Sequence, residues 1–330
     1  MMKKVQNKRI LSGIQPSGDL HIGNYFGAIR QHIEFQEGNE CYYFVANLHA
    51  MTTIQDKKKL EEATLQVAID YLALGLNPNK ANLFVQSDIP EVTELAWILS
   101  TLTPLGLLER AHSYKDKIAK GLTPNHGLFA YPVLMAADIL IYDSDVVPVG
   151  KDQKQHLEMT RDMALKLNHV FGDTLVVPAE YIMPEVAVVP GLDGLKMSKS
   201  YGNTIEIFCD YKTLKQKVMS IVTDSTPLEE PKDPDKNNVY ALYKLFASQE
   251  EKKDMRKKFL QGGYGYGHAK KELLEKIYTF FEPARKRKKE IIKDKTYVWE
   301  VLKKGAHQAR EQAQRVMSRV RENCGLIRAY

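Results

Sequence analysis

The first half of the chain alternates short apolar runs with helical patterns, and this alternation limits the folds that it can adopt. Strands are predicted from the apolar runs at 9–14, 41–47, 81–87, 145–150 and 174–180. Helices are predicted from helical patterns over 23–36, 57–74 and 152–167. Parallel strands connected by helices form one twisted sheet with helices on both of its faces. The sequence therefore predicts an α/β fold with a doubly wound, Rossmann-like parallel sheet.

The pattern changes near residue 200, where strand signals end and Lys-rich helical segments begin. We predict a Rossmann-like domain over 1–195, with a helical insertion around 90–140, and a helical domain over 196–330. In the last predicted helix, about 305–325, small residues recur on one face. Small side chains allow a close approach between elements, so this helix is expected to pack back on the first domain.

Charge and cysteine content narrow the class of protein. Net charge is +6, but residues 251–330 hold 22 Lys and Arg against 10 Asp and Glu, and residues 1–250 hold 25 against 31. A basic end favours a polyanionic partner, although helices with solvated Lys-rich faces would give the same charges. Three distant cysteines, Cys41, Cys209 and Cys324, exclude a disulfide framework and argue against a cysteine-based metal site. A cytoplasmic protein is expected, because no apolar run reaches ~18 residues and the basic N-terminus lacks the apolar stretch of a signal peptide.

The segment SGIQPSGDLHIGNYFGAIR at 12–30 leads from a predicted strand through a loop into a helix. In doubly wound folds, ligands bind at the carboxyl ends of the strands, and a helix N-terminus there presents free N–H groups to phosphate. Gly23 leaves room for a ligand against the backbone, and His21 and Asn24 add side-chain donors. An ordinary turn between a strand and a helix would have a similar composition.

Two more segments carry groups suited to a nucleotide. KMSKS at 196–200 follows PGLDG, and its two lysines would neutralise the charge of a triphosphate. VPVGKDQKQH at 147–156 places a strand end at Gly150 before a helix, where Asp152 would cap the helix or contact a ligand. Taken alone, a pentamer of Lys and Ser is typical of a solvated loop, so the functional interpretation depends on the segments occurring together.

Residues 131–140, YPVLMAADIL, form an apolar helical segment that contains one acidic residue, Asp138. A buried carboxylate needs a partner, and no Lys or Arg lies within one helical turn of it. Tyr131, Met135 and Asp138 are spaced four and three apart, so they share one face of the helix. The structural alternatives to a binding face are a distant Arg for Asp138 and core packing for Met135.

Together, GIQPSGDLHIGNY, YPVLMAADIL, VPVGKDQKQH and KMSKS resemble the signatures of bacterial-type tryptophanyl-tRNA synthetases, a family of class I aminoacyl-tRNA synthetases. The resemblance extends over the whole chain, including its length and its basic helical end. It implies a catalytic domain followed by a helical tRNA-binding domain. It also implies the family's reaction, in which L-tryptophan and Mg-ATP give tryptophanyl-adenylate and pyrophosphate, and tryptophan then passes to the 3′-terminal adenosine of tRNA(Trp).

The resemblance assigns residues to three roles. Transition-state charge would be stabilised by His21, Asn24, Lys196 and Lys199. ATP would be bound by Gln15, Pro16, Ser17, Gly23, Asn24, Gly150, Lys151, Asp152, Val188, Lys196, Met197, Ser198, Lys199 and Ser200. Tryptophan would be bound by His49, Tyr131, Met135, Asp138 and Gln153. The indole ring would pack on Met135, and its single N–H would be the partner that Asp138 lacks in its own helix.

The implied chemistry needs no general base. An α-carboxyl group has a pKa near ~3.5, so the substrate carboxylate is already a nucleophile at pH 7. Magnesium would arrive with ATP, and no structural metal is expected. Two positions depart from the family pattern: Leu11 stands where relatives often carry an aromatic residue, and Asn47 stands where many carry Asp, so Asn47 is assigned no role.

Three alternatives remain at this point. A tyrosyl-tRNA synthetase would share most of these segments, although YPVLMAAD favours tryptophan. A small-molecule nucleotidylyltransferase would use the same HIGN-type phosphate site, but it has no need for the basic helical C-terminal part. A non-catalytic RNA-binding relative would be expected to have lost HIGN or KMSKS.

The resemblance also implies partners. Phosphates of tRNA(Trp) would contact the basic cluster RKRKKE at 285–290, and neither DNA nor a membrane is expected as a partner. The family is homodimeric, and the apolar residues of ELAWILSTLTPLGLLER at 94–110 are expected to form the dimer interface.

Overall fold

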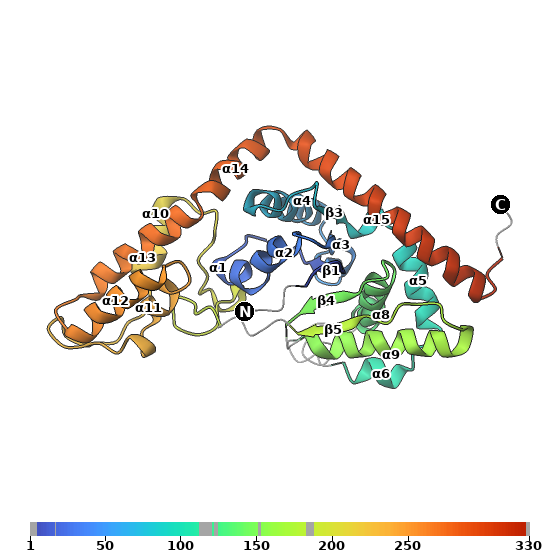
Figure 1. The fold of residues 1–330 in the computed structure, drawn as a ribbon, viewed down its shortest axis with the longest axis horizontal. Coiled ribbons are helices and arrows are strands. Elements are labelled where there is room, and N and C mark those ends of the chain that lie inside the picture. Colours follow the sequence, from blue (N-terminus) through green and yellow to red (C-terminus); the bar gives the residue numbers. More distant parts are fainter. Residues whose placement is uncertain are drawn as a thin grey trace.

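The computed structural model describes residues 5–16, 18–111, 121, 125–150, 153–182 and 188–327. Parallel strands form one sheet, in the order β3-β2-β1-β4-β5. They are β1 (Arg9–Ile14), β2 (Glu40–Val45), β3 (Ala81–Val85), β4 (Val146–Val149) and β5 (Ala179–Ile182) (Figure 1). This is the order of a Rossmann-like, doubly wound sheet, so the predicted α/β fold is confirmed.

Helices connect the strands and then continue alone towards the C-terminus. The first set comprises α1 (Ile22–Asn24), a π-helix (Tyr25–Ile29), α2 (Arg30–Phe35), α3 (Asn47–Ala50), α4 (Lys57–Leu74), α5 (Glu91–Ser100), α6 (Leu105–Glu109), α8 (His126–Leu140) and α9 (Lys154–Phe171). The second set comprises α10 (Tyr211–Met219), α11 (Asn238–Tyr243), α12 (Gln249–Gln261), α13 (Tyr266–Phe280), α14 (Glu282–Lys293) and α15 (Lys295–Asn323). Short 3₁₀ turns occupy Gln86–Asp88, Lys199–Tyr201 and Pro234–Lys236.

Each central strand contributes to two cores, because successive side chains of a strand point to opposite faces of the sheet. Ile10 and Tyr43 are buried on the face that packs against α4 and the helix after β1. Leu11 and Phe44 are buried on the other face, against α5, α8 and α9. The sheet is therefore held between two packed layers, and its carboxyl edge is a rigid base for the segments that follow each strand.

The strand predicted over 174–180 starts only at Ala179. The side chain of Asn168, on α9, binds the backbone of the preceding residues instead. Its Oδ1 accepts from the N–H groups of Thr174 and Leu175 at 3.1 and 2.8 Å, and its Nδ2 donates to the Leu175 carbonyl at 2.8 Å. These bonds satisfy the backbone groups that a strand would have used in a ladder.

Other boundaries differ from the predictions as well, among them the strand predicted over 81–87, which ends at Val85. The helix predicted over 23–36 begins at Ile22 and contains a π-helical turn in its middle. The strand predicted over 41–47 ends at Val45, because Asn47 turns into α3 and exchanges hydrogen bonds with Ser87 at 2.9 and 3.1 Å. The helix predicted over 152–167 begins at Lys154 in the part of the chain that the structure describes.

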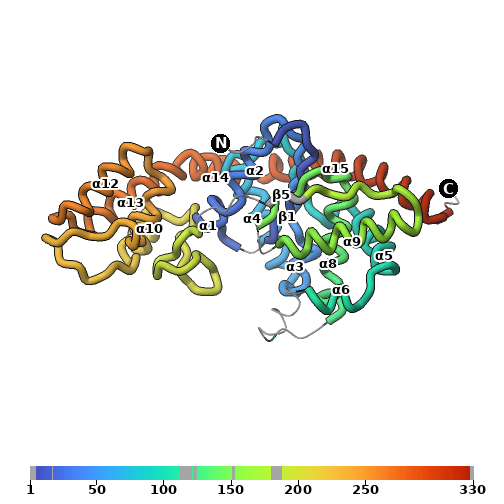
Figure 2. Tube along the Cα trace, turned by 60° about the horizontal axis from the view of Figure 1, so that its bottom comes forward, coloured from blue at the N-terminus to red at the C-terminus, as the bar shows by residue number. Residues whose placement is uncertain are grey.

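The C-terminal helix α15 returns to the sheet and lies along β3 (Figures 1 and 2). A Cβ on Gly305 would lie 2.1 Å from the carbonyl oxygen of Leu83, so the helix backbone rests directly on the strand. Ala309 and Ala313 are fully buried one and two turns further along. Small residues on this face therefore bring the two backbones together, since a larger side chain would push them apart.

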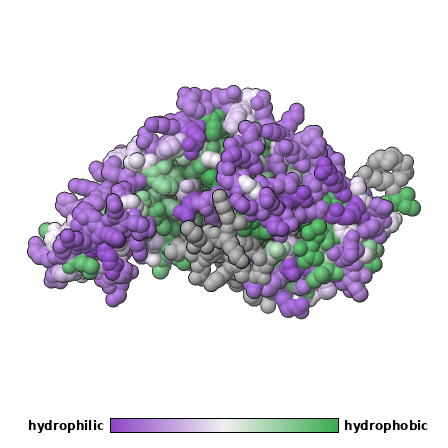
Figure 3. All heavy atoms as spheres, viewed as in Figure 1, coloured by the Kyte–Doolittle hydropathy of each residue, from purple (hydrophilic) through white to green (hydrophobic). Residues whose placement is uncertain are grey.

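The surface in Figure 3 is mostly hydrophilic, with separate hydrophobic patches. Trp97 and Leu105 are 72% and 67% exposed, and both lie in the segment 94–110 that is expected to form a dimer interface. Among the residues that the structure describes, no helix combines the length and the apolar character that crossing a membrane would require.

Candidate active site

Most of the predicted site residues follow the carboxyl ends of strands. His21 follows β1, His49 follows β2 and Gly150 follows β4. Parallel strands end at the same edge of a sheet, and the strand order reverses between β1 and β4, where doubly wound folds form their binding crevice. The topology therefore gathers at one edge residues that are far apart in the sequence.

Asp138 on α8 is 1% exposed and has two partners inside the protein. Nε2 of His49 lies 2.7 Å from its Oδ2, and the side-chain amide of Gln86 donates to both carboxylate oxygens at 2.9 Å. Burial raises the pKa of Asp138, and the hydrogen bonds from His49 and Gln86 act in the opposite direction. The fold therefore supplies two partners for this carboxylate from the ends of β2 and β3, and the predicted bond to an indole N–H would be added to them.

Gln86, which the sequence did not single out, fixes the geometry of this carboxylate. Its Oε1 accepts from the backbone N–H groups of Leu48 and His49 at 3.0 and 3.4 Å, which turns its Nε2 towards Asp138. A carboxylate offers about four lone-pair sites, so Oδ1 keeps the capacity to accept one more hydrogen bond. The only signal for Gln86 was a polar residue directly after an apolar strand, which is too common to mark a site.

Tyr131 and Met135 lie on the same face of α8 as Asp138, and both are half-buried. Oη of Tyr131 lies 2.8 Å from Nε2 of His156, a buried residue near the start of α9 that the sequence did not single out. The rings of His49 and Tyr131 meet edge to face, with centroids 6.3 Å apart. Four of the five residues predicted to bind tryptophan therefore share one neighbourhood, and the fifth, Gln153, occupies the N-cap position of α9 without a side-chain capping bond.

The HIGN segment forms a capping box. The N–H of Asn24 donates to Nδ1 of His21 at 3.3 Å, and the N–H of His21 donates to Oδ1 of Asn24 at 3.0 Å. Burial, and then the charge of Lys199, lower the pKa of His21 to about 4. The imidazole is therefore neutral at pH 7, with Nδ1 as an acceptor and its proton on Nε2. Nε2–H of His21 and the Nδ2 amide of Asn24 are the side-chain donors of this turn.

The KMSKS segment packs against HIGN. The backbone N–H of Gly23 points to Sδ of Met197 at 3.3 Å, and Nζ of Lys199 lies 3.9 Å from the position of a Cβ on Gly18. Burial lowers the pKa of Lys199, while nearby carboxylates, first Asp19, raise it. Met197 itself is buried in the core, so its contact with ATP would come from the backbone.

The other residues assigned to ATP differ in their exposure. Pro16 is buried and Val188 is 65% exposed. Half-buried positions are Gly150 and Ser198, and exposed positions are Gln15, Lys196, Lys199 and Ser200. Three residues of the predicted ATP site lie outside the described part of the chain: Ser17, Lys151 and Asp152.

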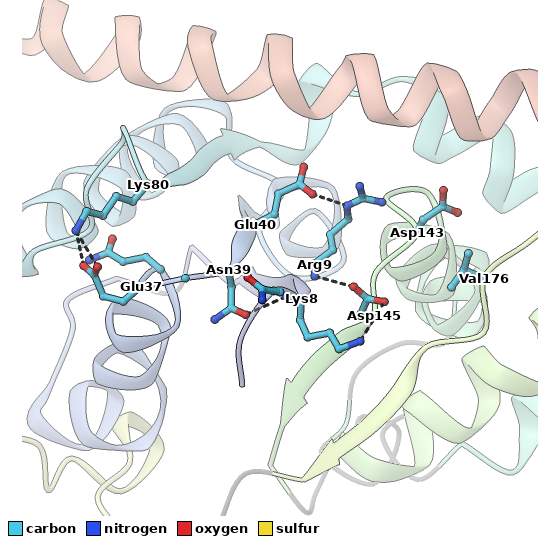
Figure 4. Close-up of a pocket in the computed structure, with 12 residues that line it drawn as sticks. Lys8, Arg9, Glu37, Asn39, Glu40, Lys80, Asp143, Asp145 and Val176 are labelled. Carbon is cyan, nitrogen blue, oxygen red and sulfur yellow. Dashed lines mark hydrogen bonds and ion pairs between the residues drawn. The ribbon is translucent and has the colours of Figure 1, made fainter. Parts of the chain in front are cut away.

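A hollow of about 910 Å³ lies at the opposite, amino-terminal edge of the sheet (Figure 4). Its charged groups bind one another: Lys80 lies 2.6 Å from Glu37, and Arg9 lies 3.0 Å from Glu40. None of the predicted site residues that the structure describes lines it. Within the residues described, no cluster of three or more His, Cys, Asp and Glu could hold a metal ion.

The basic cluster at 285–290, predicted to contact tRNA, is partly used within the protein. Nζ of Lys288 lies 2.6 Å from Oδ1 of the buried Asp70, and Nε of Arg287 donates to the carbonyl of Ala73 at 2.7 Å. These two cations join α14 to α4. The ammonium of Lys288 therefore serves a buried carboxylate, whereas Arg287 is exposed and uses Nε for this bond. Phosphate contact by the cluster stays a prediction.

Comparisons with known proteins agree with this arrangement. Residues 3–282 match the family model described as tRNA synthetases class I (W and Y). Tryptophan--tRNA ligase of Fusobacterium nucleatum is 55% identical over 97% of this chain and 98% of its own length, and that of Rhodopirellula baltica is 55% identical over 96% and 99%. A crystal structure of tryptophanyl-tRNA synthetase from Campylobacter jejuni, complexed with ADP and tryptophan, has a TM-score of 0.92 and 52% identity, covering 96% of this chain and all of that one. The chain therefore belongs to the tryptophanyl-tRNA synthetases, the tryptophan--tRNA ligases of class I.

Proposed function

We propose that the carboxyl edge of the sheet carries out tryptophan--tRNA ligation. L-Tryptophan and ATP give tryptophanyl-adenylate and pyrophosphate, and the tryptophanyl group then passes to the 3′-terminal adenosine of tRNA(Trp). The observation that carries this proposal is the buried carboxylate of Asp138, held by His49 and Gln86 on a helix face that also presents Met135. Few apolar sites need such an acceptor, and indole supplies the matching single donor.

Selection of tryptophan would follow from this acceptor. Oδ1 of Asp138 would accept the indole N–H while Met135 packs on the ring. A hydrogen bond to a charged group contributes about 1.5–3 kcal/mol, and a site that has a buried acceptor rejects ligands without the donor by up to ~10⁴-fold. Phenylalanine would fill the apolar part of the site and leave the carboxylate without this bond.

Adenylate formation would depend on positioning and on charge. The substrate carboxylate attacks the α-phosphorus, a P–O bond forms, and the electron pair of the breaking bond leaves with pyrophosphate. His21 and Asn24 would donate hydrogen bonds to the phosphates, and Lys199, together with Lys196, would neutralise their charge. Magnesium would be held mainly by the triphosphate, as is usual for this ion.

Partners and location are part of the same proposal. The exposed Trp97 and Leu105 support a homodimer interface in 94–110. Lys286 and Lys289, which are exposed in α14, remain candidates for tRNA(Trp) phosphates. The free cysteines of the described chain suit the reducing cytoplasm.

Pyrophosphate exchange into ATP tests the proposed activity. Exchange should require tryptophan, and tyrosine, phenylalanine or no amino acid should leave it near background. Transfer to tRNA(Trp) transcript, compared with a tRNA(Tyr) transcript, tests the second step. Exchange that depends on tyrosine, or on no amino acid, would contradict the proposal.

A further inference from the structure

Asn203 follows the KMSKS segment by three residues and is 3% exposed. Its Oδ1 accepts from the backbone N–H of Ser198 at 2.8 Å. Its Nδ2 donates to Oδ1 of Asp193 at 2.8 Å and to the carbonyl of Lys196 at 3.2 Å. One side-chain amide therefore binds the backbone of the KMSKS segment at its first residue, Lys196, and at its third, Ser198.

Gly191 makes room for this amide because it has no side chain. A Cβ on Gly191 would lie 2.3 Å from both Cγ and Nδ2 of Asn203, closer than real contacts allow. The segment around it is a small hairpin, because the N–H of Met197 donates to the Val189 carbonyl at 2.9 Å. The N–H of Leu192 also donates to the carbonyl of Asn203 at 3.0 Å. The hairpin and the residue that follows KMSKS thus form one unit.

The helical part of the chain holds the same hairpin from another side. Asn238, the first residue of α11, donates its Nδ2 to the carbonyl of Gly191 at 2.9 Å. Asn238 of α11 therefore binds the backbone carbonyl of Gly191, and the side chain of Asn203 packs against its α-carbon. This arrangement restrains the loop that carries Lys196 and Lys199, whose own side chains are exposed.

We propose that Asn203 is a positioning residue for adenylate formation. It fixes the backbone at residues 196 and 198, and so sets the points from which Lys196 and Lys199 extend towards the triphosphate. Long lysine side chains would otherwise sample many positions, and a displacement of about 1 Å can slow a reaction by ~10²-fold. The inference rests on the proposed function, because it gives these lysines their task.

A double-mutant cycle tests the inference. Asn203→Ala should slow single-turnover adenylate formation by about 10- to 100-fold and leave the dissociation constant of tryptophan within about twofold. If Asn203 acts through the two lysines, its effect should not add to theirs. In a background that carries both Lys196→Ala and Lys199→Ala, Asn203→Ala should then slow the reaction by less than about threefold.

A second pair of variants separates the bonds of Asn203. Asn203→Asp keeps the shape and the acceptor for Ser198, but it loses both donors and faces the carboxylate of Asp193. Asp193→Asn in that background should restore part of the rate, because an amide again meets a carboxylate. The deficit that remains should correspond to the lost bond to the Lys196 carbonyl, since a carboxylate cannot donate.

Controls distinguish positioning from general damage. Gly191→Ala should resemble Asn203→Ala, whereas Gly267→Ala on α13, where a Cβ would meet nothing within 4 Å, should match the wild type. If Asn203→Ala does not fold by circular dichroism, the isosteric Asn203→Asp enters the same cycle with Lys196→Ala and Lys199→Ala. Additive losses in the cycle, or an equal loss of tryptophan affinity, would overturn the inference. A wild-type protein without tryptophan-dependent exchange would instead overturn the proposed function.

Discussion

His49 and Asp138 meet through a contact of 2.7 Å between Nε2 and Oδ2, although 89 residues separate them in the chain. His49 comes from the short helix after β2, and Asp138 comes from the last two turns of α8. Together with Gln86 they hold a buried carboxylate in one orientation. The following predictions concern what this carboxylate and its neighbouring sites do.

Asp138→Asn should weaken tryptophan binding far more than ATP binding. The substitution keeps the shape but loses the charge, and a hydrogen bond to a charged group of about 1.5–3 kcal/mol corresponds to a loss of roughly 10- to 150-fold. Equilibrium binding of tryptophan and the KM for ATP measure the two effects, and the KM for ATP should stay within about twofold. If tryptophan affinity and the KM for ATP were impaired equally, Asp138 would have a structural role and not a role in tryptophan binding.

Gln86→Glu should shift the pH dependence of tryptophan binding. The new carboxylate would still accept from the N–H of Leu48, but it would replace the donor to Asp138 by a like charge. Repulsion raises the pKa of Asp138 further, so the carboxylate that accepts the indole N–H becomes protonated at a higher pH than in the wild type. The acid limb of tryptophan affinity, measured between pH 5.5 and 9, should move to higher pH.

Gln86→Met is the matched control for that shift. It loses the same donor without adding a charge, so its acid limb should move less than that of Gln86→Glu. Coinciding profiles for the wild type and Gln86→Glu would show that Gln86 does not influence the ionisation of Asp138.

Lys199→Ala should slow adenylate formation by about 10²- to 10³-fold, as expected when one group that stabilises transition-state charge is removed. The dissociation constant of tryptophan should stay within about twofold, because Lys199 lies near Gly18 and His21, in the segment proposed to bind the phosphates. Rapid-quench measurement of the first turnover gives the rate. A large loss of tryptophan affinity with an unchanged chemical step would contradict this assignment.

The same variant should raise the pKa of His21 from about 4 towards its ordinary value, because the charge of Lys199 is the second cause that lowers it. The folded pKa lies below the unfolded value of about 6.5. Stability from the neutral imidazole is thus present above pH 6.5 and is lost as pH falls towards 4. Between pH 6.5 and 4, the Lys199→Ala protein should therefore lose less folding stability than the wild type. Imidazole resonances followed by NMR during an acid titration measure the pKa directly.

Lys288→Met should destabilise the fold by about 3–5 kcal/mol, because it leaves the buried carboxylate of Asp70 without its cation. Adding Asp70→Asn should recover part of this loss, since no buried charge then remains. Lys293→Met, which breaks the exposed pair with Glu290, should change stability by less than about 1 kcal/mol. Urea unfolding measures the free energy of unfolding of each variant. Equal losses for Lys288→Met and Lys293→Met would show that the buried pair stabilises the fold no more than the exposed pair does.

Much of the fold could be predicted because it depends on local patterns. Apolar runs and helical spacing repeat within a few residues, so the strand at 9–14 and the start of the strand predicted over 81–87 could be located without the rest of the molecule. Glycine, proline and serine directly after the first strand predict a turn for the same local reason, while its role in phosphate binding stays a prediction. The prediction that a strand begins at residue 174 was wrong, because the side chain of Asn168, on α9, accepts the hydrogen bonds from the N–H groups of Thr174 and Leu175.

By itself, the sequence determined the order of strands and helices, the family and the acidic residue on α8 that must have a partner. Only the tertiary structure decided which partner: the ends of β2 and β3 lie side by side, so His49 and Gln86 reach Asp138 from inside the protein. It likewise assigned Lys288 to Asp70 and Asn203 to the loop before it. The physical reason is that a hydrogen bond or an ion pair depends on a few tenths of an ångström between side chains, whereas periodicity describes only each segment's own surface.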